Sequence, residues 1–179
     1  MKQIFIYVQH LLGTGHLRRV EVIADCLADN GLAVTVASGG IDEPRFEHPG
    51  VTTIRLPGIQ SDAAFSRLYD TEGEVVTDSL MKQRMRILGQ AVSAIEPDML
   101  IIESYPFARR QMRKEILALL EIAREQNCGQ TLVTCSVRDI VQPKSKPGRI
   151  DEIVALVDRY FDYVLVHGDE EFIPFDRSF

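Results

Sequence analysis

The sequence predicts an α/β fold: a doubly wound, mostly parallel sheet of about six or seven strands with helices on both faces. Two observations predict it. Short runs rich in β-branched and aromatic residues alternate along the chain with longer segments whose apolar residues recur every three or four positions. Proline or glycine separates most of these segments. Such alternation is typical of parallel sheets, because a helix returns the chain to the edge where the next strand begins.

In the first half of the chain, strand-like runs alternate with segments of helical spacing. From Leu17 onward, apolar residues fall on one helix face, and Asn30-Gly31 ends this helix because glycine readily adopts a left-handed conformation. Residues 57–77 are polar and lack a clear period, so we expect a long loop with room for a helical turn. The expected elements are a strand at 4–8, a helix at 17–30, strands at 33–37 and 51–56, and a helix at 79–95 whose inward residues are Leu80, Leu88, Val92 and Ile95.

The second half continues the same alternation. Pro97 ends the preceding helix, and the apolar run Met99–Ile102 predicts the fourth strand. The remaining expected elements are a helix at 107–126, a strand at 131–135, a loop framed by Pro143 and Pro147, a helix at 150–160 and a strand at 163–166. Ligands of such sheets bind beyond the carboxyl ends of the strands, where the strand order reverses. We therefore expect the site beside the turn that follows the first strand.

The overall composition fits one domain. The chain has 179 residues, 45% of them hydrophobic, and a net charge of −6, which argues against a general nucleic-acid binder. Its 3 cysteines are scattered and form no CxxC pair, which favours a cytoplasmic location. No apolar run approaches the roughly 18 residues of a membrane span, and we interpret the N-terminal run as a strand rather than a signal peptide. Peripheral contact with the inner face of a membrane stays open.

The turn after the first strand contains Gly13, Thr14 and Gly15, in the sequence QHLLGTGHLRRV. Two glycines allow close backbone approach, and the amides of a helix N-terminus suit an anion such as a phosphate. The hydroxyl of Thr14 is expected to cap the helix. The turn lacks the third glycine of a dinucleotide fingerprint and the Gly-Lys-Ser/Thr of a P-loop, so both of those sites are disfavoured. A tight turn with a capping threonine and no ligand is the alternative.

His16 stands where this helix begins. The positive end of a helix disfavours an imidazolium, so we expect a neutral ring near pH 7. A neutral imidazole can accept a proton from an attacking hydroxyl, which makes His16 the candidate catalytic base. The alternative is an ordinary hydrogen-bonded or exposed histidine.

Several segments together carry a family resemblance: IFIYVQHLLGTGHLRR, ASGG, ESYPFARRQMRKE, CSVRDI and VDRYFDYVLVHGD. They resemble predicted bacterial glycosyltransferases of the GT-B fold, distant relatives of the enzyme that adds N-acetylglucosamine to lipid I. The resemblance implies that residues 1–179 form the N-terminal, acceptor-side Rossmann-like half of a two-domain enzyme. It implies that the donor-binding C-terminal domain lies outside this chain. Without that domain, the chain of residues 1–179 should be nearly inactive. It also implies that the glycine turn lines the interdomain cleft, with His16 as a base or diphosphate contact.

Further candidates for substrate binding stand at the ends of later strands. Glu103 follows the fourth strand, and Arg138 and Asp139 follow the fifth; either carboxylate could orient a histidine or bind an acceptor. Arg109 belongs to a basic cluster with Arg110, Arg113 and Lys114, which an anionic ligand or internal carboxylates such as Glu103 and Glu115 must offset. Internal ion pairs are the alternative for the basic cluster. For the two carboxylates the alternative is capping of the next segment or an ion pair, which for Asp139 would be with Arg138. His167 and His10 are expected near the site, but as turn residues first.

The predicted function is transfer of a hexose-type sugar from a nucleotide-sugar to the hydroxyl of an unidentified acceptor. No Asp-x-Asp pair occurs, and we expect neither a metal nor a cofactor beyond the donor substrate. Two alternatives stay open. One is a non-catalytic subunit of a split glycosyltransferase that supplies the acceptor or membrane surface. The other is a nucleotide-sugar epimerase of related fold. The sequence after Val166 begins a loop and then ends, so we expect a second chain or a longer polypeptide to complete the protein.

Overall fold

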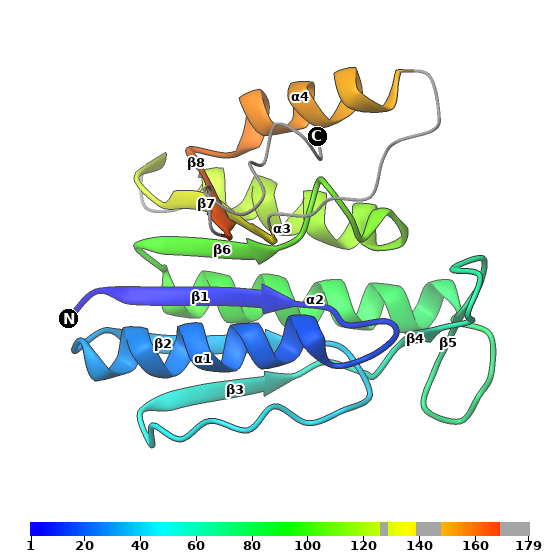
Figure 1. Cartoon of the computed structure of the whole chain (residues 1–179), viewed down its shortest axis with the longest axis horizontal. Coiled ribbons are helices and arrows are strands. Elements are labelled where there is room, and N and C mark those ends of the chain that lie inside the picture. Colours follow the sequence, from blue (N-terminus) through cyan, green and yellow to red (C-terminus); the bar gives the residue numbers. More distant parts are fainter. Residues whose placement is uncertain (126–128, 139–147, 169–179) are drawn as a thin grey trace.

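The computed structural model describes residues 1–125, 129–138 and 148–168, which form a parallel sheet with helices on both faces (Figure 1). Within these residues, the main sheet has 6 strands in the order β3-β2-β1-β6-β7-β8. The strands are Gln3–Val8 (β1), Ala33–Ser38 (β2), Val51–Arg55 (β3), Met99–Glu103 (β6), Leu132–Arg138 (β7) and Tyr163–His167 (β8). The predicted doubly wound α/β fold is thereby confirmed.

Apolar side chains from both sheet faces build two cores. Helix α1 (Gly15–Asp29) lies in front of the sheet in Figure 1 and packs on the outward residues of β1 and β2, while α2 (Asp78–Ile95) and α3 (Arg113–Glu125) lie behind it. Helix α4 (Arg149–Tyr160) contributes to the same core as α2 and α3, the one on the face of the sheet opposite α1. This arrangement follows from right-handed crossovers, because the chain moves along the sheet from β1 to β2 and β3 and then, after it returns to β6, in the opposite direction to β7 and β8.

Residues 57–77 differ from the expected loop. They contain a short antiparallel hairpin of β4 (Gln60–Ser61) and β5 (Leu68–Tyr69), which lies beyond the carboxyl ends of the main strands (Figure 1). Asp62 explains the turn, since its carboxylate accepts hydrogen bonds from the amides of Ser66 and Arg67. The expectation of a segment without strands was therefore wrong, because a two-residue strand is too short to show a period.

The helix expected from Phe107 begins later than predicted. A 3₁₀ turn covers Arg110–Met112, and α3 begins only at Arg113. Arg109 has a φ of 61°, a left-handed conformation that interrupts a right-handed helix before it can extend backward to Phe107.

A buried ion pair fixes α2 and α3 to the end of β1. Both side chains of Arg84 and Glu115 are 0% exposed, and the guanidinium Nε of Arg84 donates to Oε2 of Glu115 at 2.7 Å. The hydroxyl of Tyr7 donates to Oε1 of Glu115 at 2.6 Å, and Nη2 of Arg84 donates to Oε1 of Gln9 at 2.7 Å. Gln9, the first residue after β1, is thus held by the ion pair between α2 and α3.

Register brings the strand ends to one edge. The strand order reverses between β1 and β6, so the turn after β1 lies beside the end of β6. Glu103 pairs with Ser136 across β6 and β7, and Arg138 pairs with His167 across β7 and β8. These polar residues therefore lie at the edge of the sheet where the strand order reverses, which is where the sequence predicts the site.

Candidate functional site

The turn after β1 leaves its glycines beside open space. Gly13 has a φ of 69°, which favours glycine, and a Cβ atom built on Gly13 or Gly15 would meet no described atom within 4 Å. Thr14 makes no side-chain hydrogen bond to the helix, so the expected threonine cap is wrong. Its φ of −103° and ψ of 1° depart from the extended conformation that capping hydroxyls need. The first turn of α1 therefore has neither a side-chain cap nor an acidic residue.

His16 contacts the carboxylate of Glu103. Nδ1 of His16 lies 2.9 Å from Oε1 of Glu103, and the exposed fractions of the two side chains are 21% and 0%. An ionised carboxylate can only accept, so Nδ1 carries the hydrogen and a neutral ring keeps its lone pair on Nε2. The geometry therefore gives His16 the tautomer of a general base.

The surroundings of Glu103 favour its ionised form. Burial raises the pKa of Glu103, but hydrogen bonds from His16 and Ser136 and the charge of Arg19 outweigh it and leave the pKa lowered. Nη2 of Arg19 lies 3.4 Å from Oε1 of Glu103. Arg19 follows His16 by three positions on α1, so both residues face the same carboxylate.

Ser104 and Ser136 supply further donors. The hydroxyl of Ser104 lies 3.2 Å from Oε1 of Glu103 and 3.0 Å from Nδ1 of His16, and that of Ser136 lies 2.6 Å from Oε2. Ser104 has a φ of 70°, a strained conformation for a residue other than glycine, directly after the carboxylate. Sequence reasoning missed Arg19 and Ser104; the three-residue spacing from His16 was the available signal for Arg19.

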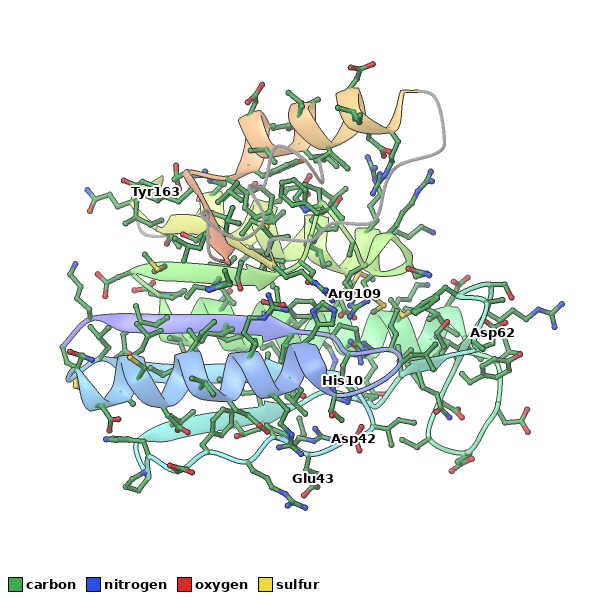
Figure 2. All side chains as sticks on the ribbon, viewed as in Figure 1. His10, Asp42, Glu43, Asp62, Arg109 and Tyr163 are labelled. Carbon is green, nitrogen blue, oxygen red and sulfur yellow. The ribbon has the colours of Figure 1, made fainter. Side chains whose placement is uncertain are left out.

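Arg109 lies at the same edge (Figure 2). Its Nε donates to the backbone oxygen of Gln9 at 2.6 Å. Burial lowers the pKa of Arg109, and the charge of Glu103 opposes this change. The guanidinium therefore belongs to the electrostatic environment of Glu103, as the sequence suggested, while it also fixes the end of β1.

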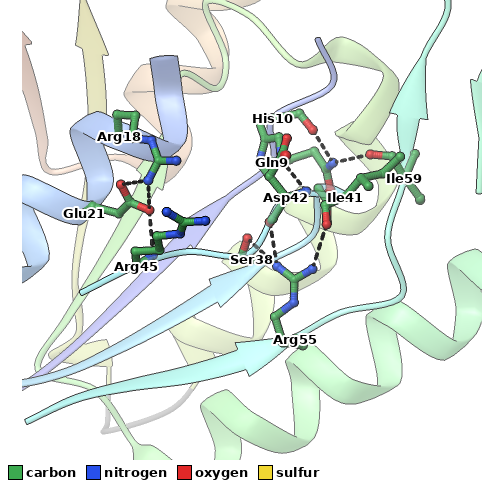
Figure 3. A network of polar contacts seen from close by, with 11 residues as sticks. Gln9, His10, Arg18, Glu21, Ser38, Ile41, Asp42, Arg45, Arg55 and Ile59 are labelled. Atoms are coloured by element: carbon green, nitrogen blue, oxygen red, sulfur yellow. Dashed lines mark hydrogen bonds and ion pairs between the residues drawn. The ribbon is translucent and has the colours of Figure 1, made fainter. Parts of the chain in front are cut away.

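The glycines after β2 serve packing. A Cβ atom on Gly40 would lie 2.0 Å from Cε1 of His10, and one on Gly39 would lie 2.3 Å from Nη2 of Arg84. Figure 3 shows His10 and Arg55 on either side of Ile41 and Asp42, the two residues that follow Gly40. The ring of His10 is buried, and its Nε2 accepts from the amide of Asp42 at 3.2 Å. Burial lowers the pKa of His10, and Asp42 opposes this.

The other predicted residues of the basic cluster divide between ion pairs and solvent. Arg113 contacts Glu152 of α4, and Glu115 is occupied by Arg84, which supports internal pairing for that part of the cluster. Arg110 and Lys114 are exposed. Arg138 is exposed at the end of β7, two residues beyond Ser136. Asp139 lies outside the described residues, so its predicted role stays a prediction.

The described residues contain neither a candidate metal site nor a candidate membrane-spanning helix. In the parts of the chain that the structure describes, no group of at least 3 His, Cys, Asp or Glu side chains has the arrangement of a metal site. Over the same residues, no helix has the length and apolarity that crossing a bilayer requires.

Solved structures of similar shape include several glycosyltransferases. No protein-family model and no curated protein matches the sequence. MurG of Acinetobacter baumannii has a TM-score of 0.55 and 10% identity over 93% of this chain and 41% of its own. UGT2 of Phytolacca americana, solved without ligand, has a TM-score of 0.55 and 13% identity over 97% of this chain and 48% of its own.

The calicheamicin glycosyltransferase CalG4 has a TM-score of 0.54 and 11% identity over 99% of this chain and 51% of its own. This chain thus spans about half the length of the glycosyltransferases that it resembles. At these identities the likeness concerns the fold alone. The resemblance inferred from the sequence is confirmed at that level: the chain has the Rossmann-like fold of one half of a GT-B glycosyltransferase.

Proposed function

We propose that this chain is the N-terminal, acceptor-side half of a nucleotide-sugar-dependent glycosyltransferase, which transfers a hexose-type sugar to an acceptor hydroxyl. The observation that carries the proposal is the contact between His16 and the buried carboxylate of Glu103, beside a glycine turn that faces open space. The similarity in fold to glycosyltransferases supports this reaction class. The donor-binding domain is proposed to lie outside residues 1–179.

His16 is the proposed base. Glu103 accepts from Nδ1–H and holds the ring, so the lone pair of Nε2 is available to an acceptor hydroxyl. As the proton moves to Nε2, the ring becomes positive, and the nearby carboxylate stabilises that charge. In this mechanism Glu103 orients His16 and does not contact the substrate, which is one of the two roles that the sequence allowed.

The transfer step balances without a further reactant. The acceptor oxygen gives its proton to His16 and forms a bond to the anomeric carbon of the donor. The bond between that carbon and the diphosphate oxygen breaks, and the nucleoside diphosphate leaves with the electron pair. The proton on His16 then passes to solvent or to the leaving group.

Cationic and dipolar groups at this edge suit an anionic leaving group. The first turn of α1 has no acidic residue, and its amides carry the positive end of the helix dipole. Gly13 and Gly15 let a diphosphate approach this backbone closely, and Arg109 adds a charge to the same edge. These residues are proposed to bind the substrate, together with Thr14 and Arg138.

The test is a transfer assay on the polypeptide encoded by the whole reading frame, with a panel of nucleotide-sugars and acceptors. We expect His16→Ala to lower kcat by about 10²–10⁴-fold, the usual contribution of a general base, with little change in thermal stability. His48 lies in the loop before β3, so His48→Ala is the matched control and should retain full activity.

Each other outcome of this assay selects an alternative. Turnover unaffected by His16→Ala would exclude the proposed mechanism. Activity that requires a separate co-purifying chain, and survives His16→Ala, would indicate a non-catalytic subunit. Conversion of the free nucleotide-sugar to its epimer without transfer would indicate an epimerase.

A further inference from the structure

The hydrogen bonds around Glu103 continue beyond the proposed base. Oε2 of Glu103 accepts from the hydroxyl of Ser136 at 2.6 Å, and the same hydroxyl oxygen lies 3.0 Å from Nε2 of His167. Glu103, Ser136 and His167 come from three adjacent strands, β6, β7 and β8. The series of hydrogen bonds therefore runs from His16 on α1 across the sheet to β8, the edge strand.

Counting hydrogens fixes the direction of each bond. Ser136 has a single hydroxyl hydrogen, and the ionised Glu103 can only accept it. The hydroxyl oxygen of Ser136 must then accept from His167, so Nε2 of His167 carries a hydrogen. The two rings are thereby assigned different donor nitrogens, Nδ1 in His16 and Nε2 in His167.

We propose that Ser136 and His167 are positioning residues for His16, an inference that rests on the proposed function. His167 donates to Ser136, and Ser136 donates to Oε2 of Glu103, which leaves Oε1 directed at the Nδ1–H of His16. Neither residue needs to contact a substrate. Their effect is to hold the carboxylate in the one orientation that supports the proposed base.

The arm formed by Ser136 and His167 keeps its donors over a wide pH range. Burial and the charge of Arg19 lower the pKa of His167, although Glu103 opposes this, so the neutral ring predominates at neutral pH. Protonation at lower pH adds a hydrogen to Nδ1 and leaves the Nε2–H donor in place. Ser136 is 1% exposed, so water competes little for its hydroxyl.

The test is NMR spectroscopy of the ¹⁵N-labelled chain of residues 1–179, without any sugar or acceptor. Long-range ¹H–¹⁵N spectra report which ring nitrogen carries hydrogen, and we expect Nδ1–H for His16 and Nε2–H for His167. We expect Ser136→Ala and His167→Phe to accelerate solvent exchange of the His16 ring hydrogen by about tenfold, as one lost hydrogen bond allows.

Matched variants separate positioning from general damage. His167→Gln keeps a nitrogen donor near the position of Nε2 and should restore slow exchange, while His48→Gln, in the loop before β3, should have no effect. A wild-type His167 with its hydrogen on Nδ1 would overturn the proposal. So would unchanged exchange of the His16 ring hydrogen in the folded variants. If Ser136→Ala does not fold, His167→Phe at the partly exposed edge decides the question.

This experiment is independent of the transfer assay. The expected tautomers and exchange rates in a protein without transferase activity would refute the proposed function and leave the arm intact. Transfer that depends on His16, with exchange unaffected by both arm variants, would refute the arm alone.

Discussion

Nδ1 of His16 and Oε1 of Glu103 lie 2.9 Å apart although 87 positions separate the two residues in the sequence. The contact joins the first turn of α1 to the end of β6, across the point where the strand order reverses. A carboxylate at this position determines which nitrogen of the ring is available for proton transfer.

Glu103→Gln tests this dependence. The amide of glutamine can donate as well as accept, so the ring of His16 can move its hydrogen to Nε2 and lose the available lone pair. We expect kcat of the full-length protein to fall by about 10²–10⁴-fold. The measurement is kcat with saturating donor, and Glu72→Gln, at an exposed position before α2, is the control. Wild-type kcat in Glu103→Gln would contradict the assigned role.

Acid should destabilise the fold through two histidines. Burial lowers the pKa of both His10 and His167 below the ordinary value of 6.5. Below pH 6.5 these two histidines are therefore protonated in the unfolded chain but still neutral in the folded chain. The free energy of unfolding falls as the pH decreases from 6.5 toward the lowered pKa values of the folded state. Urea denaturation at several pH values measures this, and His167→Gln should flatten the slope between pH 7 and pH 5. An equal slope in that variant would contradict the prediction.

A fully buried ion pair and a partly exposed one should contribute differently to the stability of the fold. Glu115→Ala leaves the guanidinium of Arg84 buried without its carboxylate, and we expect a loss of about 3–5 kcal/mol. Arg113→Ala breaks a pair whose side chains are 39% and 30% exposed, and we expect a loss of at most about 1 kcal/mol. Urea denaturation at pH 7 compares the two variants. Equal losses would show that burial does not govern these pairs.

Substitution by alanine should destabilise the fold at Gly40 but not at Gly15. A methyl group on Gly40 would collide with the ring of His10, so Gly40→Ala should cost about 1–3 kcal/mol, partly restored by a second change, His10→Ala. Gly15 begins α1 beside open space, so Gly15→Ala should leave stability unchanged or slightly raised. Thermal unfolding measures both, and a stable Gly40→Ala protein would refute the packing role.

The local pattern of the sequence was enough for most of the fold. The main strands and helices α1 to α4 lie close to the positions that the sequence predicts, because β-branched runs and helical spacing are properties of neighbouring residues. The helix before β7 was extended too far toward its N-terminus, since the left-handed conformation of Arg109 left no signal in composition. Arg84 was also overlooked, although it stands four residues after Leu80 and four before Leu88 on the inward face of α2.

By itself, the sequence determined the α/β alternation, the glycine turn, and the presence of polar residues after the strands. Tertiary structure alone decided that Glu103 contacts His16, that Ser136 links this carboxylate to His167, and that the glycines after β2 pack on His10 and Arg84. The physical reason is the distance along the sequence over which each interaction acts. Periodicity and turn preference act within a few residues, whereas a hydrogen bond between separate strand ends exists only after sheet order and register have brought them together.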